Sequence, residues 1–564
     1  MLVRAERGGS DFRSGAAVFP GGVLDAGDRA AHAWCLGEAL THDDASLSRR
    51  FNLAQAALDY AIAALRESFE EVGVLHACAP DGSALDLTPG SNLHSALQPW
   101  RERLQSVGTD RAGMADLCQA FDLRLDLRGL AYTAHWLTPP GLPKRWDTRF
   151  FAALAPAGQE AVADGGEAVS VLWTTPRAAL DGASAVLPFA GAPPAGTGLK
   201  LLPAMRTMLA DLAQFSSAAA AMAALHGREQ VTLTMPRRGA SRSGARIVLP
   251  SELPYAEIAR LDPQGRGDVS CELLPGRAVQ LSVNVWRVTA PNPGVMTGPG
   301  TNTYLVGAGD EWTAIDPGPV HTDHLQALLD AAAQAGGRIA RILVTHTHRD
   351  HSPGAAPLAA ATGAPVWGRL PLHPHWQDES FQAQHQPLHG ERFEAAPGVW
   401  LRAIHTPGHA SNHLCFLLEA EKLLFTGDHV MQGSTVVINP PDGNMAVYLN
   451  SLQALLHEDL DWLAPGHGFL VDRPHDVLRK LVAHRLKREA KVLKVLHERG
   501  PGTPAELVAH VYDDAPVALH GVAQRSLLAH LVKLQAEGQA RSEGAEGAEG
   551  ADAVGEASRW IASA

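Results

Sequence analysis

The chain contains the stretch Thr345-His346-Thr347-His348-Arg349-Asp350-His351, which follows the apolar run Ile342-Leu343-Val344. The run predicts a buried strand, and residues two apart in an extended chain point the same way, so His346 and His348 can share one metal ion. Asp350 and His351, where the chain turns into the next helix, can face a second ion. Imidazole and carboxylate are ligands that zinc and similar divalent metals prefer. The stretch therefore predicts a metal site at the end of a strand.

Three later loops each offer one more ligand-type residue at the end of an apolar run. These residues are His409, Asp428 and His467. A lone histidine or aspartate is more often a hydrogen-bonded structural residue than a ligand. Packing does not explain the whole set in this order, so the set predicts a centre for two metal ions. Three neighbouring histidines are expected to support the ligands, because ligand imidazoles need partners that fix their tautomer. They are His405, His413 and His429.

These motifs resemble the metallo-β-lactamase superfamily, whose fold is an αββα sandwich with two metal ions at one edge. The resemblance implies a first ion held by His346, His348 and His409. It implies a second ion held by Asp350, His351 and His467, with Asp428 bridging the ions and Asp316 supporting the loop. The bridging carboxylate is the superfamily's hydrolase pattern and true β-lactamases lack it here, so antibiotic hydrolysis is not expected. Two Zn²⁺ or similar divalent ions would acidify a shared water and stabilise charge on the substrate oxygen, with Asp350 and Asp428 as catalytic carboxylates.

Two further features narrow the resemblance to the β-lactamase-like protein 2 group, some of whose members cleave single-stranded RNA. One is the segment 292–305. The other is a C-terminal pattern of three helices and two short strand candidates, 539–542 and 558–562, which suggests a winged helix around a Glu-Gly-Ala repeat. The resemblance favours phosphodiester cleavage of single-stranded nucleic acid (RNA). The alternative is a glyoxalase II-like thioester or ester hydrolase, a type that carries a different helical appendage.

A predicted helix over 477–498 is rich in lysine and arginine, although the net charge of the chain is −13. Its basic side chains include Lys487, Arg488, Lys491 and Lys494. They could form a track for the phosphate groups of RNA. The alternative is a solvated helix face, which is the commoner role of such charge runs.

A second motif lies near the N-terminus, in a helical segment that includes Arg66. Glu67, Glu70 and Glu71 crowd carboxylates onto one face, which is either a solvated acidic face or a cation site. Together with Phe19-Pro20-Gly21-Gly22 and Asp28 upstream, the segment resembles the Nudix box. The resemblance implies an α/β/α sandwich that binds Mg²⁺ or Mn²⁺ against a diphosphate. The 37 residues between Asp28 and Arg66 are predicted to be an insertion.

Residues 136–139 and 145–151 resemble the coenzyme A diphosphatase type of Nudix protein known as moiety X motif 19. This resemblance implies a nucleotide or coenzyme A derivative as substrate, with Arg66, Glu70 and Glu71 as catalytic residues. It also implies Glu67, Glu70 and Glu71 as metal ligands. Glu167 in a later loop is a candidate base or ligand, or else an acidic turn residue. A different hypothesis makes the domain a non-catalytic nucleotide sensor.

The chain of 564 residues is long enough for several domains, and changes in composition divide it. We expect an α/β multi-domain protein with a Nudix-like domain (1–225), a linker (226–276), a metallo-β-lactamase-fold domain (277–475) and a winged helix (476–564). The five cysteines lie far apart without a CxxC pattern, which argues against a disulfide framework. Early charged residues and the lack of a long apolar run argue against export and a membrane span, so we expect a cytoplasmic protein.

Overall fold

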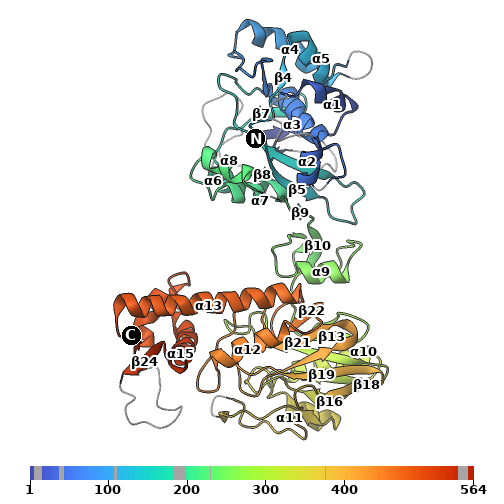
Figure 1. Cartoon of the computed structure of the whole chain (residues 1–564). Coiled ribbons are helices and arrows are strands. Elements are labelled where there is room, and N and C mark those ends of the chain that lie inside the picture. Colours follow the sequence, from blue (N-terminus) through green and yellow to red (C-terminus); the bar gives the residue numbers. More distant parts are fainter. Residues whose placement is uncertain are drawn as a thin grey trace. The chain divides into compact units, whose positions relative to one another are not determined.

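The computed structural model describes residues 1–4, 15–36, 44–51, 53–106, 111–182, 199–228, 230–374, 377–543 and 557–563. They form two compact units, Met1–Pro236 and Arg237–Ala564 (Figure 1). Within these described ranges, no helix combines the length and the apolar character needed to cross a bilayer. Each unit has its own hydrophobic clusters.

The described part of the first unit contains three small β-sheets. A four-stranded sheet has the order β7-β1-β2-β8, with strands Ala168–Val171, Leu2–Arg4, Ala16–Val18 and Lys200–Leu201. A three-stranded sheet has the order β6-β5-β9, with strands Asp147–Ala152, Ala131–Leu137 and Leu233–Thr234. The third sheet pairs β3 (Ala77–Cys78) with β4 (Arg124–Leu125).

The described α-helices of the first unit include the one that carries the acidic motif. They are α1 (Ala26–Ala30), α2 (Asp44–Phe51), α3 (Ala57–Val72), α4 (Asn92–Gln105), α5 (Met114–Phe121), α6 (Pro176–Leu180), α7 (Pro203–Leu212) and α8 (Ala218–His226). Helix α3 lies in the core, because Leu58, Ile62, Leu65 and Phe69 recur at helical spacing and pack in one cluster. It ends at Gly73, whose φ of 71° lets its N–H reach the carbonyl of Phe69. The glutamates of α3 therefore sit on a rigid element.

The second unit is built around two six-stranded sheets. One sheet runs β12-β13-β14-β15-β16-β17, with strands Ala278–Gln280, Val285–Thr289, Asn302–Ala308, Glu311–Ile315, Arg338–Leu343 and Val366–Trp367. The other runs β18-β19-β20-β21-β22-β23, with strands Arg392–Ala396, Val399–His405, Leu414–Leu418, Leu423–Gly427, Trp462–Pro465 and Val471–Asp472. The first sheet contains two parallel pairings, β15 with β16 and β16 with β17, whereas the second contains one, β21 with β22.

Alternating side chains bury both faces of these sheets. In β14, Tyr304 and Val306 pack into the cluster shared by the two sheets, whereas Leu305 packs with α10 (Thr322–Gln334) and α11 (Ala355–Thr362) on the outer face. On the second sheet, α12 (Met445–Leu455) covers the outer face in the same way. The predicted αββα sandwich is confirmed.

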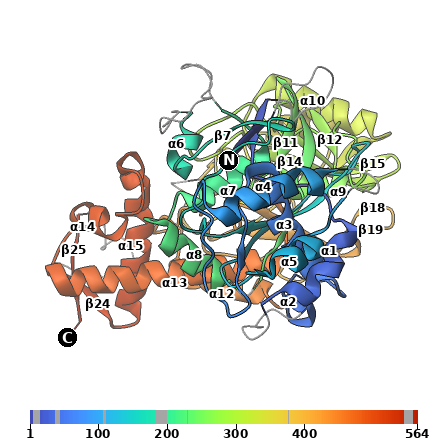
Figure 2. The same cartoon turned by 90° about the horizontal axis from the view of Figure 1, so that it is seen from above.

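The C-terminal part of the second unit is a winged helix, as predicted. Its helices are α13 (Pro474–Arg499), α14 (Pro504–Val511) and α15 (His520–Ala536), and its hairpin pairs β24 (Ala540–Glu543) with β25 (Arg559–Ala562) (Figure 2). Trp560 is fully buried among leucine and valine side chains of the three helices. Most of the Glu-Gly-Ala repeat, at 544–550, lies outside the described residues.

The segment predicted as a linker, 226–276, is largely folded. From Arg237 onward it belongs to the second unit, as a hairpin of β10 (Arg237–Ser241) and β11 (Gly244–Val248) followed by α9 (Tyr255–Leu261). Its glycines serve the fold: Gly244 has a φ of 113°, and a Cβ on Gly239 would meet Cys271 and Ile258 at 3.0 Å. The buried Glu257 of α9 also forms two hydrogen bonds with Arg287 of β13.

Candidate metal centre

The loop 344–354 follows β16 and is held by Asp316, which lies at the end of the neighbouring parallel strand β15. The Asp316 carboxylate accepts hydrogen bonds from the backbone N–H and the hydroxyl of Thr345, both at 2.7 Å. It also accepts one from Nδ1 of His351 at 2.9 Å. Parallel pairing brings the ends of β15 and β16 together, so one buried carboxylate orients both ends of the predicted motif. Asp316 thus contacts both Thr345 and His351, as a residue that supports this loop would do.

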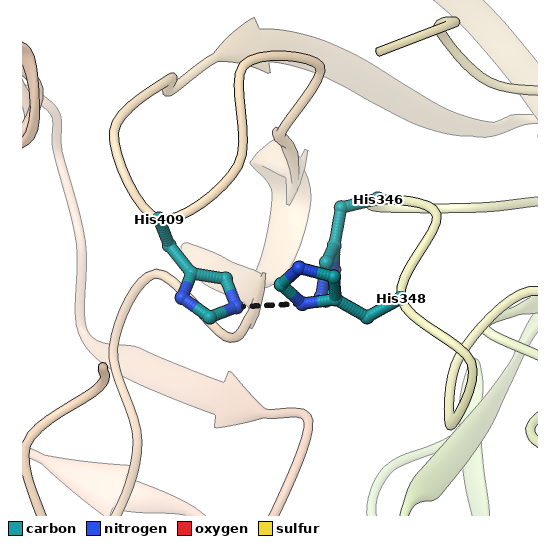
Figure 3. A group of neighbouring side chains, drawn as sticks. All are labelled: His346, His348 and His409. Atoms are coloured by element: carbon teal, nitrogen blue, oxygen red, sulfur yellow. Dashed lines mark hydrogen bonds between the residues drawn. The ribbon is translucent and has the colours of Figure 1, made fainter. Parts of the chain in front are cut away.

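The first cluster consists of His346, His348 and His409, whose rings converge from two loops (Figure 3). Nδ1 of His348 lies 3.0 Å from Nε2 of His346 and 3.0 Å from Nε2 of His409. His409 comes from the loop after β19, so the cluster joins the two sheets of the sandwich. Three nitrogen atoms that face one another at this spacing form a set of donors suited to one divalent ion.

The second cluster consists of Asp350, His351, Asp428 and His467. Nε2 of His351 lies 3.4 Å from Oδ2 of Asp350 and 3.3 Å from Oδ1 of Asp428. Nε2 of His467 lies 3.2 Å and 3.3 Å from the same two oxygens. Four ligand atoms arranged tetrahedrally at zinc–ligand distances of about 2.0–2.1 Å lie about 3.3–3.4 Å from one another. The spacing of this cluster fits that geometry.

Asp428 connects the two clusters. Its Oδ1 faces His351 and His467, while its Oδ2 lies 3.7 Å from Nε2 of the first-cluster residue His409. It follows β21 and is 8% exposed, so it is held between the loops rather than in solvent. One carboxylate therefore presents one oxygen to each cluster.

Hydrogen bonds behind the clusters determine which ring nitrogens face inward. Nδ1 of His409 donates to the carbonyl of Val437 at 2.7 Å, and Nδ1 of His467 donates to the carbonyl of Gly300 at 3.2 Å. These bonds leave the Nε2 lone pairs toward the centre. In the described part of the chain, Nε2 of His351, Nε2 of His467 and Oδ1 of Asp428 are buried without a hydrogen-bond partner. Buried polar atoms rarely remain unpaired, so the cluster fits a metal ion.

The two clusters differ in charge. Burial lowers the pKa of His346 well below its ordinary value, lowers that of His348 to about 3 and also lowers that of His409. In the second cluster, burial alone would lower the pKa of His467, but Asp428 and Asp350 raise it to about 9. The first cluster is thus a set of neutral imidazoles, whereas the second contains protons that a binding ion would displace.

The three neighbouring histidines occupy different places. His413 and His429 are fully buried, and the His413 ring stacks on His346 with centroids 5.0 Å apart. His405 is partly buried and its Nε2 donates to the carbonyl of Ser411 at 3.2 Å. Support of the ligands by His413 is consistent with this stacking.

A polar network that the sequence analysis missed links the ligand loops. Asp442 accepts hydrogen bonds from the Ser411 backbone at 3.0 Å and from Nε2 of Gln377 at 2.7 Å. Gln377 in turn accepts one from the hydroxyl of Thr347 at 2.9 Å. Thr347 lies between two ligand-type histidines, and Ser411 lies two residues after a third. Asp442 stands in a Pro-Pro-Asp-Gly turn, so its sequence signal is only that of a turn.

In the first unit, the acidic motif surrounds Arg66. This guanidinium bonds both oxygens of Asp28, at 2.8 and 3.2 Å, and it also contacts Glu67 at 2.7 Å and Glu70 at 3.3 Å. Asp28 therefore meets Arg66 across the insertion. All four side chains are buried.

Glu71 and Glu167 meet a second arginine. Arg4 lies 3.6 Å from Glu71 and 3.0 Å from Glu167, and the N–H of Gly21 donates to Glu71 at 2.9 Å. Burial raises the pKa of Glu71 to about 7. Among the described residues, only the two clusters of the second unit bring three or more possible ligand atoms within 4.8 Å of one another. The glutamates of α3 do not converge in that way.

The basic helix α13 differs from the predicted phosphate track. Arg488 is buried and pairs with Asp514 at 2.8 and 2.9 Å, and Lys491 pairs with Asp513. Arg485 is also buried. These three side chains contact other groups of the protein, so they are less available to bind phosphate groups of RNA. Their apolar stems can pack against the protein while the charged ends form these contacts.

Three family models match the chain. Residues 1–185 match the NUDT19 Nudix domain, residues 296–467 match the Metallo-beta-lactamase superfamily, and residues 503–549 match the Beta-lactamase associated winged helix domain.

Relatives match the second unit. The chain is 32% identical over 262 residues to a Beta-lactamase-like protein 2 homolog of Caenorhabditis elegans, covering 46% of this chain and 86% of the relative. It is 33% identical over 242 residues to an Atrochrysone carboxyl ACP thioesterase of Passalora fulva, covering 41% and 69%. A metallo-beta-lactamase family protein from Thermus thermophilus has a similar structure, with 22% identity, a TM-score of 0.43 and coverage of 50% and 100%.

Proposed function

The chain belongs to the metallo-beta-lactamase superfamily, and we propose that its central domain is a dinuclear metal-dependent hydrolase bridged by Asp428. Both this superfamily and the Nudix family are hydrolase families. The observation that carries the proposal is the position of Asp428, with one oxygen 3.3 Å from two histidines of one cluster and the other 3.7 Å from a histidine of the other. One ion would be held by His346, His348 and His409. The other would be held by Asp350, His351 and His467.

The chemistry of such a site follows from its donors. Two divalent ions bound there would acidify a water molecule and stabilise negative charge on a substrate oxygen. Asp428 would keep the clusters in register, because it is buried and faces both. The Asp350 side chain is 28% exposed and lies 3.2 Å from Nε2 of His467, so it can meet solvent and orient a hydrogen-bonded water from that side.

For the substrate we favour a thioester or ester over RNA. The phosphate track predicted on α13 gives less support to an RNA substrate, because Arg485 and Arg488 are buried and Lys491 pairs with Asp513. Relatives 33% and 34% identical to this chain are named as acyl carrier protein thioesterases.

Exposed apolar side chains on the loops beside the ligands agree with an acyl substrate. Val295 is 80% exposed and Met296 is 48% exposed, in the loop that ends at Gly300, the partner of His467. Leu372 is 79% exposed, and its backbone N–H bonds Ser411 in the loop of His409. Exposed apolar groups near a catalytic centre suit an apolar substrate, since covering them removes their surface from water.

The test compares substrate classes on one preparation. We expect full-length protein to hydrolyse acyl-coenzyme A or acyl carrier thioesters, to lose this activity with a chelator and to regain it with Zn²⁺, while single-stranded RNA stays intact. In Leu372→Ser, KM should rise for long acyl chains and stay unchanged for acetyl thioesters, which serve as the internal control. RNA cleavage without thioester hydrolysis would overturn this choice of substrate and leave the dinuclear site standing.

Single-stranded RNA remains the second candidate because of a lysine stripe on α13. Lys480, Lys487 and Lys494 are exposed and seven residues apart, so they lie along one side of the helix. Replacing all three with Gln should lower the slope of log affinity against log salt by about 0.7 for each phosphate group that the helix no longer binds. Lys491→Gln is the matched control, because the Lys491 side chain pairs with Asp513 and is 30% exposed, whereas Lys494, which lies 3.8 Å from Glu498, is 69% exposed. An unchanged slope in the triple variant would remove this candidate's structural support.

For the first unit we propose Mg²⁺- or Mn²⁺-dependent hydrolysis of a diphosphate in a nucleotide or coenzyme A derivative. Around α3, five carboxylates surround two guanidinium groups, those of Arg4 and Arg66. The excess negative charge favours a divalent cation. Coenzyme A and ADP-ribose should be cleaved with Mg²⁺. Binding of either compound without turnover would support a sensor instead.

A further inference from the structure

The segment 436–438 lies directly behind the first metal cluster. The carbonyl of Val437 accepts the Nδ1 hydrogen bond of His409 at 2.7 Å. That bond selects the tautomer of His409 and leaves its Nε2 for the centre. The flanking residues Val436 and Ile438 are buried, so the position of this carbonyl depends on what packs against the segment.

The winged helix holds the same segment from the other side. The guanidinium of Arg485 on α13 donates to the carbonyl of Val436, and the N–H of Ile438 donates to the hydroxyl of Ser526 on α15 at 3.3 Å. Figures 1 and 2 both show α13 passing alongside α12, and the two helices share one apolar cluster. Three consecutive residues are thus bonded alternately to the winged helix and to a candidate ligand.

Arg485 also braces the loop that carries His409. Its guanidinium lies over the ring of Tyr448, 5.5 Å from the centroid. The Tyr448 backbone packs so tightly on Gly408 that a Cβ there would meet it at 2.3 Å. Within the described residues, no carboxylate pairs with Arg485, although it is only 2% exposed. Burying a guanidinium is costly unless it has partners, and here the carbonyl of Val436 and the ring of Tyr448 provide them, while Nε has no hydrogen-bond partner in the described part of the chain.

We propose that Arg485 and Ser526 are positioning residues of the metal centre, through which the winged helix sets the orientation of His409. The inference rests on the proposed role of His409 as a ligand. It makes the winged helix a structural part of the first cluster rather than an attached binding module.

The effect should be confined to the first cluster. In the second cluster, Nδ1 of His351 bonds Asp316 and Nδ1 of His467 bonds Gly300, both outside the winged helix. Loss of the hydrogen bonds from Arg485 and Ser526 to the segment 436–438 should therefore lower the affinity for the first ion and leave the affinity for the second unchanged.

The test measures metal affinity in the full-length protein. We expect Arg485→Met, which keeps an apolar stem on Tyr448, and Ser526→Ala to bind one of two Zn²⁺ ions about tenfold more weakly in competition with a chelator. Arg485→Lys should recover part of the loss, since an ammonium group can donate to Val436. Arg488→Met is the matched control: it is buried on the same helix but contacts Val511, Asp514 and Tyr512, so it should lower stability and keep both affinities.

Hydrogen exchange provides a second readout that stability alone would not change. Because coupling is reciprocal, adding Zn²⁺ should slow amide exchange around 436–438 and Ser526 in the wild type and less so in Arg485→Met. Wild-type affinity for both ions in Arg485→Met and Ser526→Ala, or equal weakening of both ions, would overturn the inference. A wild type that binds fewer than two ions would instead overturn the proposed dinuclear site.

Discussion

The loop 345–351 and helix α3 both gather side chains that attract cations, but the two regions meet that demand differently. In the loop, hydrogen bonds from outside orient the rings and leave Nε2 of His351 without a partner. On α3, the glutamates already contact protein cations, Arg66 and Arg4. A metal ion would thus pair with orphaned ligand atoms in the second unit, whereas in the first it would join cations that the protein already supplies.

This difference has a consequence for affinity. Imidazoles and carboxylates placed in advance lose little freedom when an ion binds, so the central site should hold its metal through purification. Glutamates shared with arginines suit Mg²⁺, which keeps part of its water shell and is usually bound together with the phosphates of the substrate. The comparison can be tested by substitutions on each side.

The largest effect is expected for Asp428→Ala. Without the carboxylate that faces both clusters, activity of the central domain should fall by at least about 100-fold, beyond the range for residues that only support ligands. Metal analysis should show fewer bound ions. Asp459→Asn is a control for loss of an acidic side chain, because Asp459 pairs with Lys422 at the surface. Two bound ions and wild-type turnover in Asp428→Ala would contradict the dinuclear assignment.

A comparable but separate loss is expected for Glu70→Gln. The amide keeps the size of the side chain and removes its charge, so Mg²⁺-dependent diphosphate cleavage should drop by at least about 100-fold, the lower end for one acid–base group. Hydrolysis by the central domain should stay the same, since the two sites use different residues. Glu102→Gln, on the exposed face of α4, is the control. Equal diphosphate cleavage in Glu70→Gln and wild type would support the sensor hypothesis.

The smallest effect is a difference in stability between alanine substitutions at two adjacent glycines, Gly21 and Gly22. A Cβ on Gly22 would lie 2.2 Å from Oε1 of Glu67, whereas one on Gly21 would meet nothing within 4 Å. Gly22→Ala must therefore displace Glu67 and should destabilise the first unit by about 1–3 kcal/mol, as overpacking does. Gly21→Ala should leave stability within about 0.5 kcal/mol, measured by denaturant unfolding. Equal stabilities of the two variants would show that Glu67 is not held against Gly22.

Much of the candidate site could be predicted from the sequence because its residue types and spacing carry the information. The loop 345–351 places two histidines two residues apart on an extended chain, and the structure brings both into one cluster with His409. Asp28 and Arg66, which the Nudix resemblance groups in one motif, form a hydrogen bond although 37 residues separate them. The placement of His346 and His348 follows from strand periodicity, which is local, whereas the meeting of Asp28 with Arg66 depends on the tertiary fold.

Other interpretations described their segments only in part, because local composition does not report burial. Glycine, serine and arginine in 226–276 suggested a linker, yet Glu257 of this segment forms a buried pair with Arg287 of β13. The positive charges of 477–498 suggested a phosphate track, yet Arg488 folds back onto Asp514. In both segments the partner lies outside the local window, so the pattern alone could not identify it.

By itself, the sequence determined the ligand-type residues and their order, since strand-end motifs consist of consecutive residues, and their resemblance to the superfamily implied the sandwich that carries them. Only the tertiary structure decided which backbone carbonyls orient the rings and that the winged helix reaches them through Val436 and Ile438. Every residue has a backbone carbonyl group, so the residue type does not indicate which carbonyl orients a ring. Its role depends on where the chain places it in space.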